Sequence, residues 1–246
     1  MSSLQNAREA PLWLDSFDES LHGRKPLDGP VSVDVAIIGG GYSGLWTAYY
    51  LLENDPSLRV LIIEKEFCGY GASGRNGGWC EGALAGGTEK YAKRSTMGEA
   101  LRLERTMFET VDEIQRVLDS EDINCDFHKG GFVSVARNLP QAQRQRSAVE
   151  LARERGTGEE IIRILDADEA RAHVNASNVH SGIFFAPSAV VDPGKMVRGL
   201  AKAVERKGGT IVEGTTALSI STGKVVCAEG VVSADVIVQA TEGYTR

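Results

Sequence analysis

Residues 31–64 read VSVDVAIIGGGYSGLWTAYYLLENDPSLRVLIIE, and this stretch decides the fold. An apolar run rich in β-branched residues leads into three glycines, helix-forming sequence follows, and a second apolar run ends on Glu64. Residues 39–44 match the pattern G-x-G-x-x-G, and Glu64 follows at about the ~20-residue spacing expected of a ribose-binding acid. The stretch therefore predicts a strand–turn–helix–strand unit that binds a dinucleotide.

The residue types of this motif suit a bound pyrophosphate. Gly39 permits the tight turn out of the strand, Gly41 lets the backbone approach the pyrophosphate, and Gly44 lets the helix lie close to the sheet. The pyrophosphate would sit on the unpaired N–H groups at the start of the helix. Glu64 would accept hydrogen bonds from a ribose diol and would repel a 2′-phosphate, which argues against NADP. A helix cap in a glycine-rich protein is the alternative explanation, because the chain holds 28 glycines.

The composition is that of an ordinary globular protein, with 246 residues, 42% hydrophobic and 25% charged. A net charge of −7 argues against nucleic acid or an anionic membrane as a partner. The four cysteines are widely spaced, and no His or Cys spacing indicates a metal site. The chain start lacks the apolar core of a signal peptide and no run approaches a membrane span, so we expect a cytoplasmic location.

The pattern of elements predicts an α/β protein in which a nucleotide-binding fold opens, is interrupted and resumes. The expected segments are an N-terminal arm (1–30), a first nucleotide-binding segment (31–90), a partial substrate or cap domain (91–180) and a second nucleotide-binding segment (181–246).

Local signals mark the ends of several elements. Capping boxes at Thr96 and Asp166 and the pair Asp192-Pro193 predict helix starts. A strand pair is expected around Gly130-Gly131, within residues 127–135. Further strands are expected at 210–212, 224–227 and 236–238.

Beyond these patterns, residues 34–45 together with Glu64 resemble the opening of the FAD-dependent D-amino-acid oxidase superfamily, which includes glycine oxidase and sarcosine oxidase. The loop GASGRNGG, residues 71–78, resembles a subgroup typified by gamma-glutamylputrescine oxidoreductases. Residues 187–199 and 236–245 are similar to the family's return into its FAD domain. The resemblance implies a Rossmann-like FAD-binding domain of the glutathione-reductase type, interrupted by a mainly helical part of a substrate domain. It also implies that a C-terminal half is missing.

The resemblance assigns cofactor contacts to particular positions. It places the pyrophosphate at Gly39, Gly41, Ser43 and Gly44, and the adenosine ribose at Glu64. The other implied contacts are Ala72, Ser73, Arg75, Asn76 and Gly77 along the ribityl chain and isoalloxazine ring, the backbone of Ala217 at the adenine edge, and Ala240 and Thr241 beside the diphosphate, with Tyr42 and Lys65 completing the set. A solvated side chain is the alternative interpretation of Lys65.

Two positions depart from the family pattern. Glu242 stands where relatives usually have glycine or asparagine. Arg75 lies in the loop where some relatives attach the flavin to a histidine, so covalent attachment there is not expected.

The function implied is FAD-dependent oxidation of the C–N bond of a small amine or amino acid, by hydride transfer to the flavin. An NAD-linked dehydrogenase and a catalytically inactive nucleotide-binding fragment are the alternatives. A flavin absorption spectrum separates the FAD-dependent oxidoreductase from the NAD-linked dehydrogenase, and turnover with amines separates it from the inactive fragment. No residue is identified as catalytic. The sequence leaves open the amine, the electron acceptor and the oligomeric state.

Overall fold

The computed structural model describes residues 11–16 and 23–245. Of the expected N-terminal arm, residues 1–10 and 17–22 lie outside this described part. The chain divides into two compact units. Within the described residues, the first unit comprises 11–16, 23–77, 121–125 and 192–245, and the second comprises 78–120 and 126–191. Residues 78–90 therefore group with the second unit.

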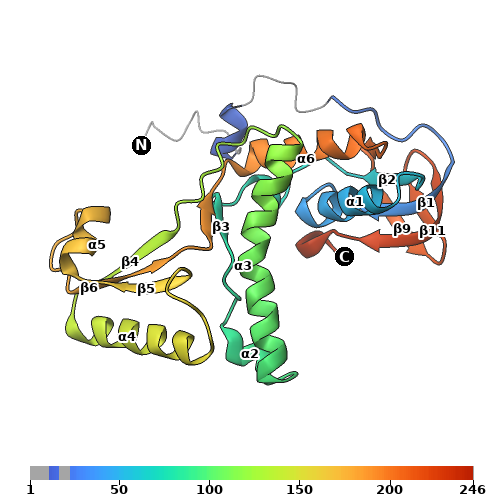
Figure 1. The fold of residues 1–246 in the computed structure, drawn as a ribbon. Coiled ribbons are helices and arrows are strands. Elements are labelled where there is room, and N and C mark those ends of the chain that lie inside the picture. Colours follow the sequence, from blue (N-terminus) through green and yellow to red (C-terminus); the bar gives the residue numbers. More distant parts are fainter. Residues whose placement is uncertain (1–10, 17–22, 246) are drawn as a thin grey trace, which may run out of the picture. The chain divides into compact units, whose positions relative to one another are not determined.

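The first unit is built on a six-stranded sheet (Figure 1). The strand order of this sheet is β8-β2-β1-β11-β10-β9. Its strands are β1 (Val31–Ile38), β2 (Val60–Ile63), β8 (Thr210–Val212), β9 (Ala217–Ser221), β10 (Lys224–Cys227) and β11 (Val231–Gln239). The strands β8, β2, β1 and β11 are parallel, whereas β11, β10 and β9 are antiparallel neighbours. The carboxyl ends of the four parallel strands consequently meet at one edge of the sheet.

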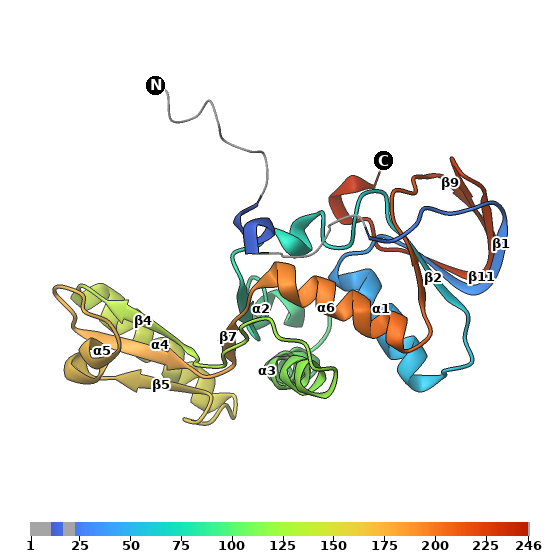
Figure 2. The same ribbon diagram turned by 90° about the horizontal axis from the view of Figure 1, so that it is seen from above.

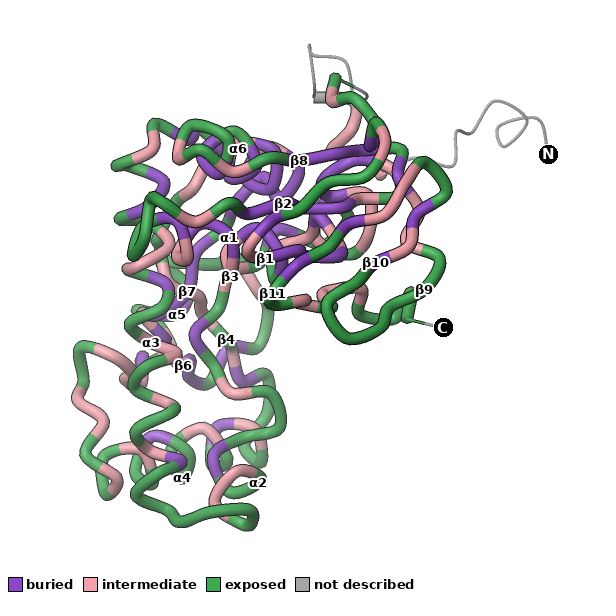
Figure 3. Tube along the Cα trace, turned by 90° about the vertical axis from the view of Figure 1, so that its right-hand side faces the viewer, coloured by how far each residue is buried: buried purple, intermediate pink, exposed green. Residues whose placement is uncertain are grey.

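Burial explains why the parallel strands are so apolar. Every residue of β2 and the last four of β1 are buried, as expected of parallel strands covered on both faces. Figure 3 shows β1 and β2 mainly in the buried colour, whereas β9 is mostly exposed. This parallel core confirms the α/β class that the sequence predicts.

Two helices of the first unit pack against each other and on the parallel strands (Figures 1 and 2). They are α1 (Tyr42–Asn54) and α6 (Pro193–Arg206). The predicted start of α6 is confirmed, because the Asp192 side chain accepts hydrogen bonds from the backbone N–H groups of Gly194 and Lys195. Short 3-10 helices complete the unit at Leu12–Ser16 (η1), Ala72–Gly74 (η2) and Glu242–Tyr244 (η3).

The second unit combines four helices with two small antiparallel sheets. Its helices are α2 (Thr88–Ala92), α3 (Met97–Ser120), α4 (Leu139–Glu154) and α5 (Ala167–His173). One sheet has the order β4-β6-β5, from Phe132–Ala136, Ser181–Phe185 and Ile162–Leu165; the other pairs β3 (Trp79–Glu81) with β7 (Ser188–Val190). Both bonds of the predicted capping box at Asp166 are present at the start of α5.

The predicted strand pair around Gly130-Gly131 is wrong. Only Phe132–Ala136 forms a strand there, and its partner is β6, which lies much later in the sequence. Gly131 has a positive φ of 69° and ends the strand on its amino side. The glycine pair therefore precedes the first residue of a single strand and is not the turn of a hairpin.

Strands at 210–212 and 224–227 are confirmed as predicted, and the strand predicted at 236–238 is part of the longer β11. Among the described residues, no helix combines the length and apolarity that crossing a bilayer requires.

Candidate cofactor site

Four sequence positions come together at the carboxyl edge of the parallel sheet. Glu213 follows β8, Glu64 follows β2, Gly39 follows β1 and Ala240 follows β11. The strand ends are in register, because Ile63 pairs with both Val212 and Ile38, and Ile38 also pairs with Gln239. Ligands of open α/β sheets bind at this edge, where neighbouring strands connect in opposite directions. Here β1 is that position, since α1 leads to β2 on one side while β11 lies on the other.

Gly39 and Gly44 are required by the packing of the turn itself. Gly39 has a φ of 111°, and a Cβ there would lie 2.4 Å from the Ala240 carbonyl oxygen. A Cβ on Gly44 would lie 2.0 Å from the Gly39 carbonyl oxygen and 3.2 Å from Cγ2 of Ile37. The helix α1 can therefore approach the end of β1 only because both positions lack a side chain.

Gly41 and Ser73 meet at the start of α1. Gly41 is the N-cap residue and has an extended backbone, with φ −88° and ψ −176°. The backbone N–H of Tyr42 donates to Ser73 Oγ at 2.9 Å, and a Cβ on Gly41 would lie 3.0 Å from the same oxygen. The amides of Ser43 and Gly44 belong to the first turn, where the helix offers them no acceptor. This helix end presents N–H groups and a positive dipole to an anion.

Gly40, the middle glycine, is a site position that the motif analysis missed. A Cβ there would lie 2.7 Å from Sγ of Cys68 and 3.3 Å from Cβ of Glu64. Cys68 is fully buried, and burial raises the pKa of its thiol well above the usual value, so the sulfur is a neutral packing group. The pattern G-x-G allows any residue at the middle position, whereas in this structure a side chain at Gly40 would overlap its neighbours.

Gly40→Ala is expected to lower the free energy of unfolding by about 1–3 kcal/mol, because the new methyl group overlaps a buried sulfur. Adding Cys68→Ala should restore part of this loss, since it removes the atom at 2.7 Å. Urea unfolding of the single and double variants measures both effects. Gly23→Ala is the control, because a Cβ at Gly23 meets nothing within 4 Å. Wild-type stability of Gly40→Ala would show that the turn tolerates a side chain.

Glu64 is held with a fixed orientation. Its Oε2 accepts from the Gly40 N–H at 2.7 Å and its Oε1 from the Glu66 N–H at 2.9 Å. Burial raises the pKa of the Glu64 carboxyl; the backbone hydrogen bonds from Glu66 and Gly40 oppose the rise, and the charges of Glu213 and Glu66 add to it. Each carboxylate oxygen can accept two hydrogen bonds, so both keep acceptor capacity for a ribose hydroxyl. The side chain of Lys65 is 67% exposed and lies 3.8 Å from Glu66 Oε1.

Contacts within the protein hold the loop that contains Arg75 and Asn76. The Asn76 amide donates to the Ser73 carbonyl at 2.9 Å, and the Asn76 carbonyl accepts from Nε1 of Trp13 at 2.8 Å. The Arg75 guanidinium donates to the Tyr70 carbonyl and lies 4.6 Å from the centre of the Tyr70 ring. Ser73 thus contacts the start of α1. The side chains of Arg75 and Asn76 instead donate to backbone carbonyls of their own loop.

The chain that leaves β11 completes the edge. The Ala240 N–H donates to the Ile38 carbonyl at 2.8 Å, and the Thr241 and Thr245 hydroxyls lie 2.6 Å apart. Glu242, which departs from the family pattern, has a left-handed backbone with φ 45°. Glycine and asparagine adopt that conformation readily and glutamate does not, which explains why they are usual there.

Ala217 contacts a different part of the first unit. It opens β9, is half-buried and packs against the hydrophobic cluster that includes Leu61 and Val225. Ala72 and Gly77 lie on the same loop as Ser73, in and just after η2.

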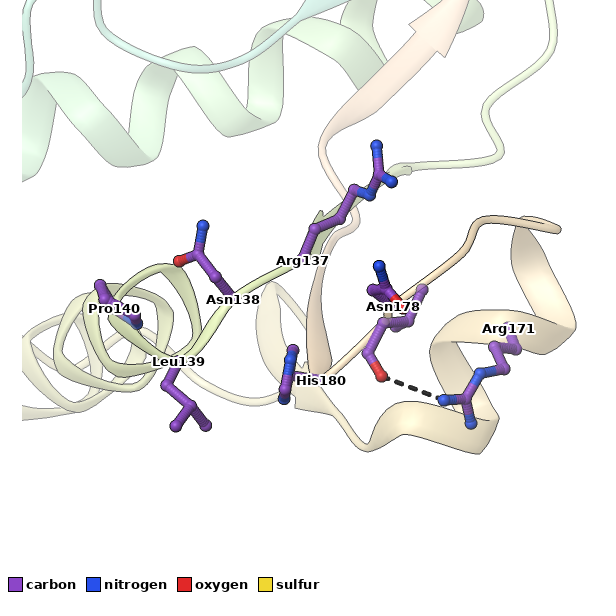
Figure 4. A pocket seen from close by; sticks show the side chains of 8 residues that line it. Arg137, Asn138, Leu139, Pro140, Arg171, Asn178 and His180 are labelled. Carbon is purple, nitrogen blue, oxygen red and sulfur yellow. Dashed lines mark hydrogen bonds between the residues drawn. The ribbon is translucent and has the colours of Figure 1, made fainter.

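A cavity of about 610 Å³ lies elsewhere, in the second unit (Figure 4). Arg137 and Arg171 line it, but Arg137 donates to the carbonyl and hydroxyl of Ser177, and Arg171 donates to Asp168 and to the Val179 carbonyl. None of the predicted cofactor contacts lines this cavity.

The parallel sheet, the glycine turn into α1 and the acid after β2 define a dinucleotide-binding domain. A family model described as "FAD dependent oxidoreductase" matches residues 34–246. The chain belongs to this FAD-dependent oxidoreductase family, which confirms the resemblance, and FAD is the cofactor of the family.

Curated relatives agree with this assignment. The chain is 29% identical over 223 residues to the gamma-glutamylputrescine oxidoreductase of Escherichia coli (strain K12), covering 89% of this chain and 51% of the relative. It is 30% identical over 227 residues to the probable oxidoreductase OrdL of Haemophilus influenzae, with the same coverage. The chain spans about half the length of the curated relatives it matches.

Solved structures show the same fold. The L-amino acid deaminase of Proteus myxofaciens aligns over 91% of this chain and 48% of its own, with a TM-score of 0.71 and 22% identity. The glycine oxidase of Geobacillus kaustophilus aligns over 85% of this chain and 55% of its own, with a TM-score of 0.67 and 23% identity.

Proposed function

We propose that this chain is the FAD-binding part of an oxidoreductase that oxidises the C–N bond of a small amine or amino acid. The observation that carries the proposal is the meeting of the α1 start, the Glu64 carboxylate and Ser73 at one edge of the parallel sheet. When bound there, FAD supplies the hydride acceptor. The chain's own residues bind and orient it.

The residues present fit the pyrophosphate and the adenosine ribose of FAD. The first-turn amides of Ser43 and Gly44, with the positive end of α1, suit a pyrophosphate, and the absence of a side chain on Gly41 leaves the approach open. Glu64 suits the adenosine ribose, because both carboxylate oxygens keep acceptor capacity after bonding to the backbone.

The remaining predicted contacts are assigned as part of the same proposal. The ribityl chain and isoalloxazine ring would lie along the loop of Ala72, Ser73, Arg75, Asn76 and Gly77; the adenine edge would lie at the Ala217 backbone, and the diphosphate beside Tyr42, Ala240 and Thr241. Lys65, whose side chain is 67% exposed and lies 3.8 Å from Glu66 Oε1, stays in the proposed set of contacts as the neighbour of Glu64.

The names of the relatives support the class of substrate. They include a gamma-glutamylputrescine oxidoreductase, glycine oxidases and L-amino acid deaminases. These proteins act on compounds that carry an amine, and the chain's acidic net charge of −7 suits a cationic one. A nitrogen-bearing substrate is therefore proposed here in preference to an alcohol.

The purified chain is expected to release FAD on denaturation, identified by chromatography and mass. In the oxidoreductase of which this chain is proposed to be the FAD-binding part, bound FAD should lose its visible absorption when an oxidisable amine is added without oxygen, because the substrate passes its electrons to the flavin. Gamma-glutamylated putrescine, sarcosine, glycine and D-amino acids are the compounds to compare, with a 2-hydroxy acid as control. Release of NAD or of FMN alone would contradict the cofactor assignment, and bleaching by the 2-hydroxy acid alone would contradict the substrate class.

A further inference from the structure

Glu213 and Glu64 are neighbours at the carboxyl edge of the sheet. Each directly follows one of two adjacent parallel strands, β8 and β2, whose last residues Val212 and Ile63 are in register. Their backbones are joined, because the Glu64 N–H donates to the Val212 carbonyl and the Thr215 N–H to the Glu64 carbonyl, both at 2.9 Å. The two glutamates therefore lie side by side at the carboxyl ends of β8 and β2, and the charge of Glu213 contributes to the raised pKa of the Glu64 carboxyl.

Glu213 holds the loop that carries Glu64. Its Oε1 accepts from the Cys68 N–H at 2.8 Å, while the Gly69 N–H donates to the Gly40 carbonyl at 3.0 Å. Residues 64–69 are thus fixed between the Glu213 side chain and the glycine turn. The same loop presents the Glu66 N–H that bonds to Glu64 Oε1, so its position sets the orientation of the Glu64 carboxylate.

Arg24 is the cation that faces Glu213. Its guanidinium donates to Glu213 Oε1 at 3.0 Å and forms a bidentate pair with Glu205, with both distances 2.7 Å. The backbone around Arg24 is also attached, because the Glu213 N–H donates to the Lys25 carbonyl and the Leu27 N–H to Oγ1 of Thr215. The segment before β1 thereby runs along residues 213–215.

Arg24 compensates the burial of the Glu213 carboxylate. The Glu213 side chain is only 2% exposed, and its Oε2 has no hydrogen-bond partner in the part of the chain that the structure describes. A buried carboxylate with one oxygen unpaired is costly unless a charge compensates it. Without Arg24, the buried Glu213 side chain would lose its compensating charge and be driven to move, which weakens its hold on the Cys68 N–H.

We propose that Glu213, compensated by Arg24, is a positioning residue of the cofactor site, because it fixes the loop that orients Glu64 toward the adenosine ribose. This inference rests on the proposed placement of the ribose at Glu64. Neither residue would touch the cofactor itself. Their effect on binding passes through residues 64–69.

A double-mutant cycle on the chain freed of cofactor tests the proposal, with ADP and FAD as titrants. Arg24→Met is expected to raise the ADP dissociation constant about tenfold, since it leaves the buried Glu213 uncompensated. Glu213→Gln should cost only a few-fold, because its amide oxygen can still accept from Cys68. In the Glu213→Gln background, Arg24→Met should change the dissociation constant by less than about twofold, since no charge remains to compensate.

The cycle separates positioning from mere tethering. If Arg24 acted only by tying the arm to Glu205, Arg24→Met would cost the same in both backgrounds, and this equality would overturn the proposal. Arg59→Met is the matched control, because Arg59 pairs with Asp34 of β1 in the same unit, away from the carboxyl edge. Its ADP affinity should equal that of the wild type. Arg24→Lys, which keeps the charge, should bind ADP within about threefold of the wild type and serves if Arg24→Met does not fold.

The Glu64→Ala variant distinguishes a failure of the positioning proposal from a failure of the ribose placement at Glu64. If Glu64→Ala weakens ADP binding and Arg24→Met does not, the positioning proposal is wrong and the ribose placement stands. If Glu64→Ala also leaves ADP binding unchanged, the ribose placement itself is wrong, and the positioning proposal falls with it.

Discussion

Gly44→Ala is expected to destabilise the chain by more than ~3 kcal/mol and to abolish FAD binding. The new Cβ would lie 2.0 Å from the Gly39 carbonyl oxygen, and neither backbone can retreat. The Gly39 N–H is bonded to the Ile63 carbonyl at 2.9 Å, and the far side of Gly39 faces the Ala240 carbonyl. Alanine favours a helix over glycine by ~1 kcal/mol, which is too little to offset such an overlap.

Gly98→Ala in α3 is the matched control, because it also adds a methyl group to a helical glycine. The nearest atom to that methyl would be Oγ1 of Thr96 at 3.9 Å, so the variant should be unchanged or more stable by up to ~1 kcal/mol. Chemical unfolding of both variants gives the comparison. A Gly44→Ala midpoint equal to that of the wild type would show that α1 does not need its close approach to β1.

Glu64→Arg is expected to weaken FAD binding at least ~100-fold, which corresponds to ~2.7 kcal/mol. The substitution removes the ribose acceptor and leaves the N–H groups of Gly40 and Glu66 facing a cation instead of a carboxylate. Glu64→Gln keeps the size and one acceptor oxygen, so its affinity should stay within about tenfold of the wild type.

Flavin fluorescence quenching during titration of the cofactor-free chain measures all three dissociation constants. Thermal unfolding of the unbound variants shows whether a loss of affinity reflects loss of the fold. Equal affinity in the wild type and in a folded Glu64→Arg chain would remove Glu64 from the cofactor site.

The sequence predicted the parts of the fold that have local signals. The strands at 210–212 and 224–227, the Asp192 cap and the Asp166 capping box depend on neighbouring residues, and all are present. The β4–β6 pairing was missed because no pattern within residues 127–135 indicates a partner so far along the chain.

The candidate site likewise contains residues that local sequence signals predict and residues that they do not. The glycine motif and Glu64 were predicted from spacing, whereas the roles of Gly40, Arg24 and Glu213 were not. Their contacts join residues 145 and 189 positions apart, from Cys68 to Glu213 and from Arg24 to Glu213. A buried glutamate that pairs with an arginine far away in the sequence leaves no pattern in a single sequence. The same two residue types also form exposed pairs on the surface, so their presence alone does not reveal a buried pair.

The order of the strands in the first unit also bears on when the site can form during folding. β1 and β2 are close in sequence, but the other neighbour of β1 is β11, in which Gln239 pairs with Ile38 about 200 residues away. Closing so long a loop costs chain entropy before the contacts between β1 and β11 can offset that cost. During synthesis the amino-terminal half of the site must wait for the whole second unit to be made. The glycine turn would thus be synthesised long before the strand that completes its surroundings.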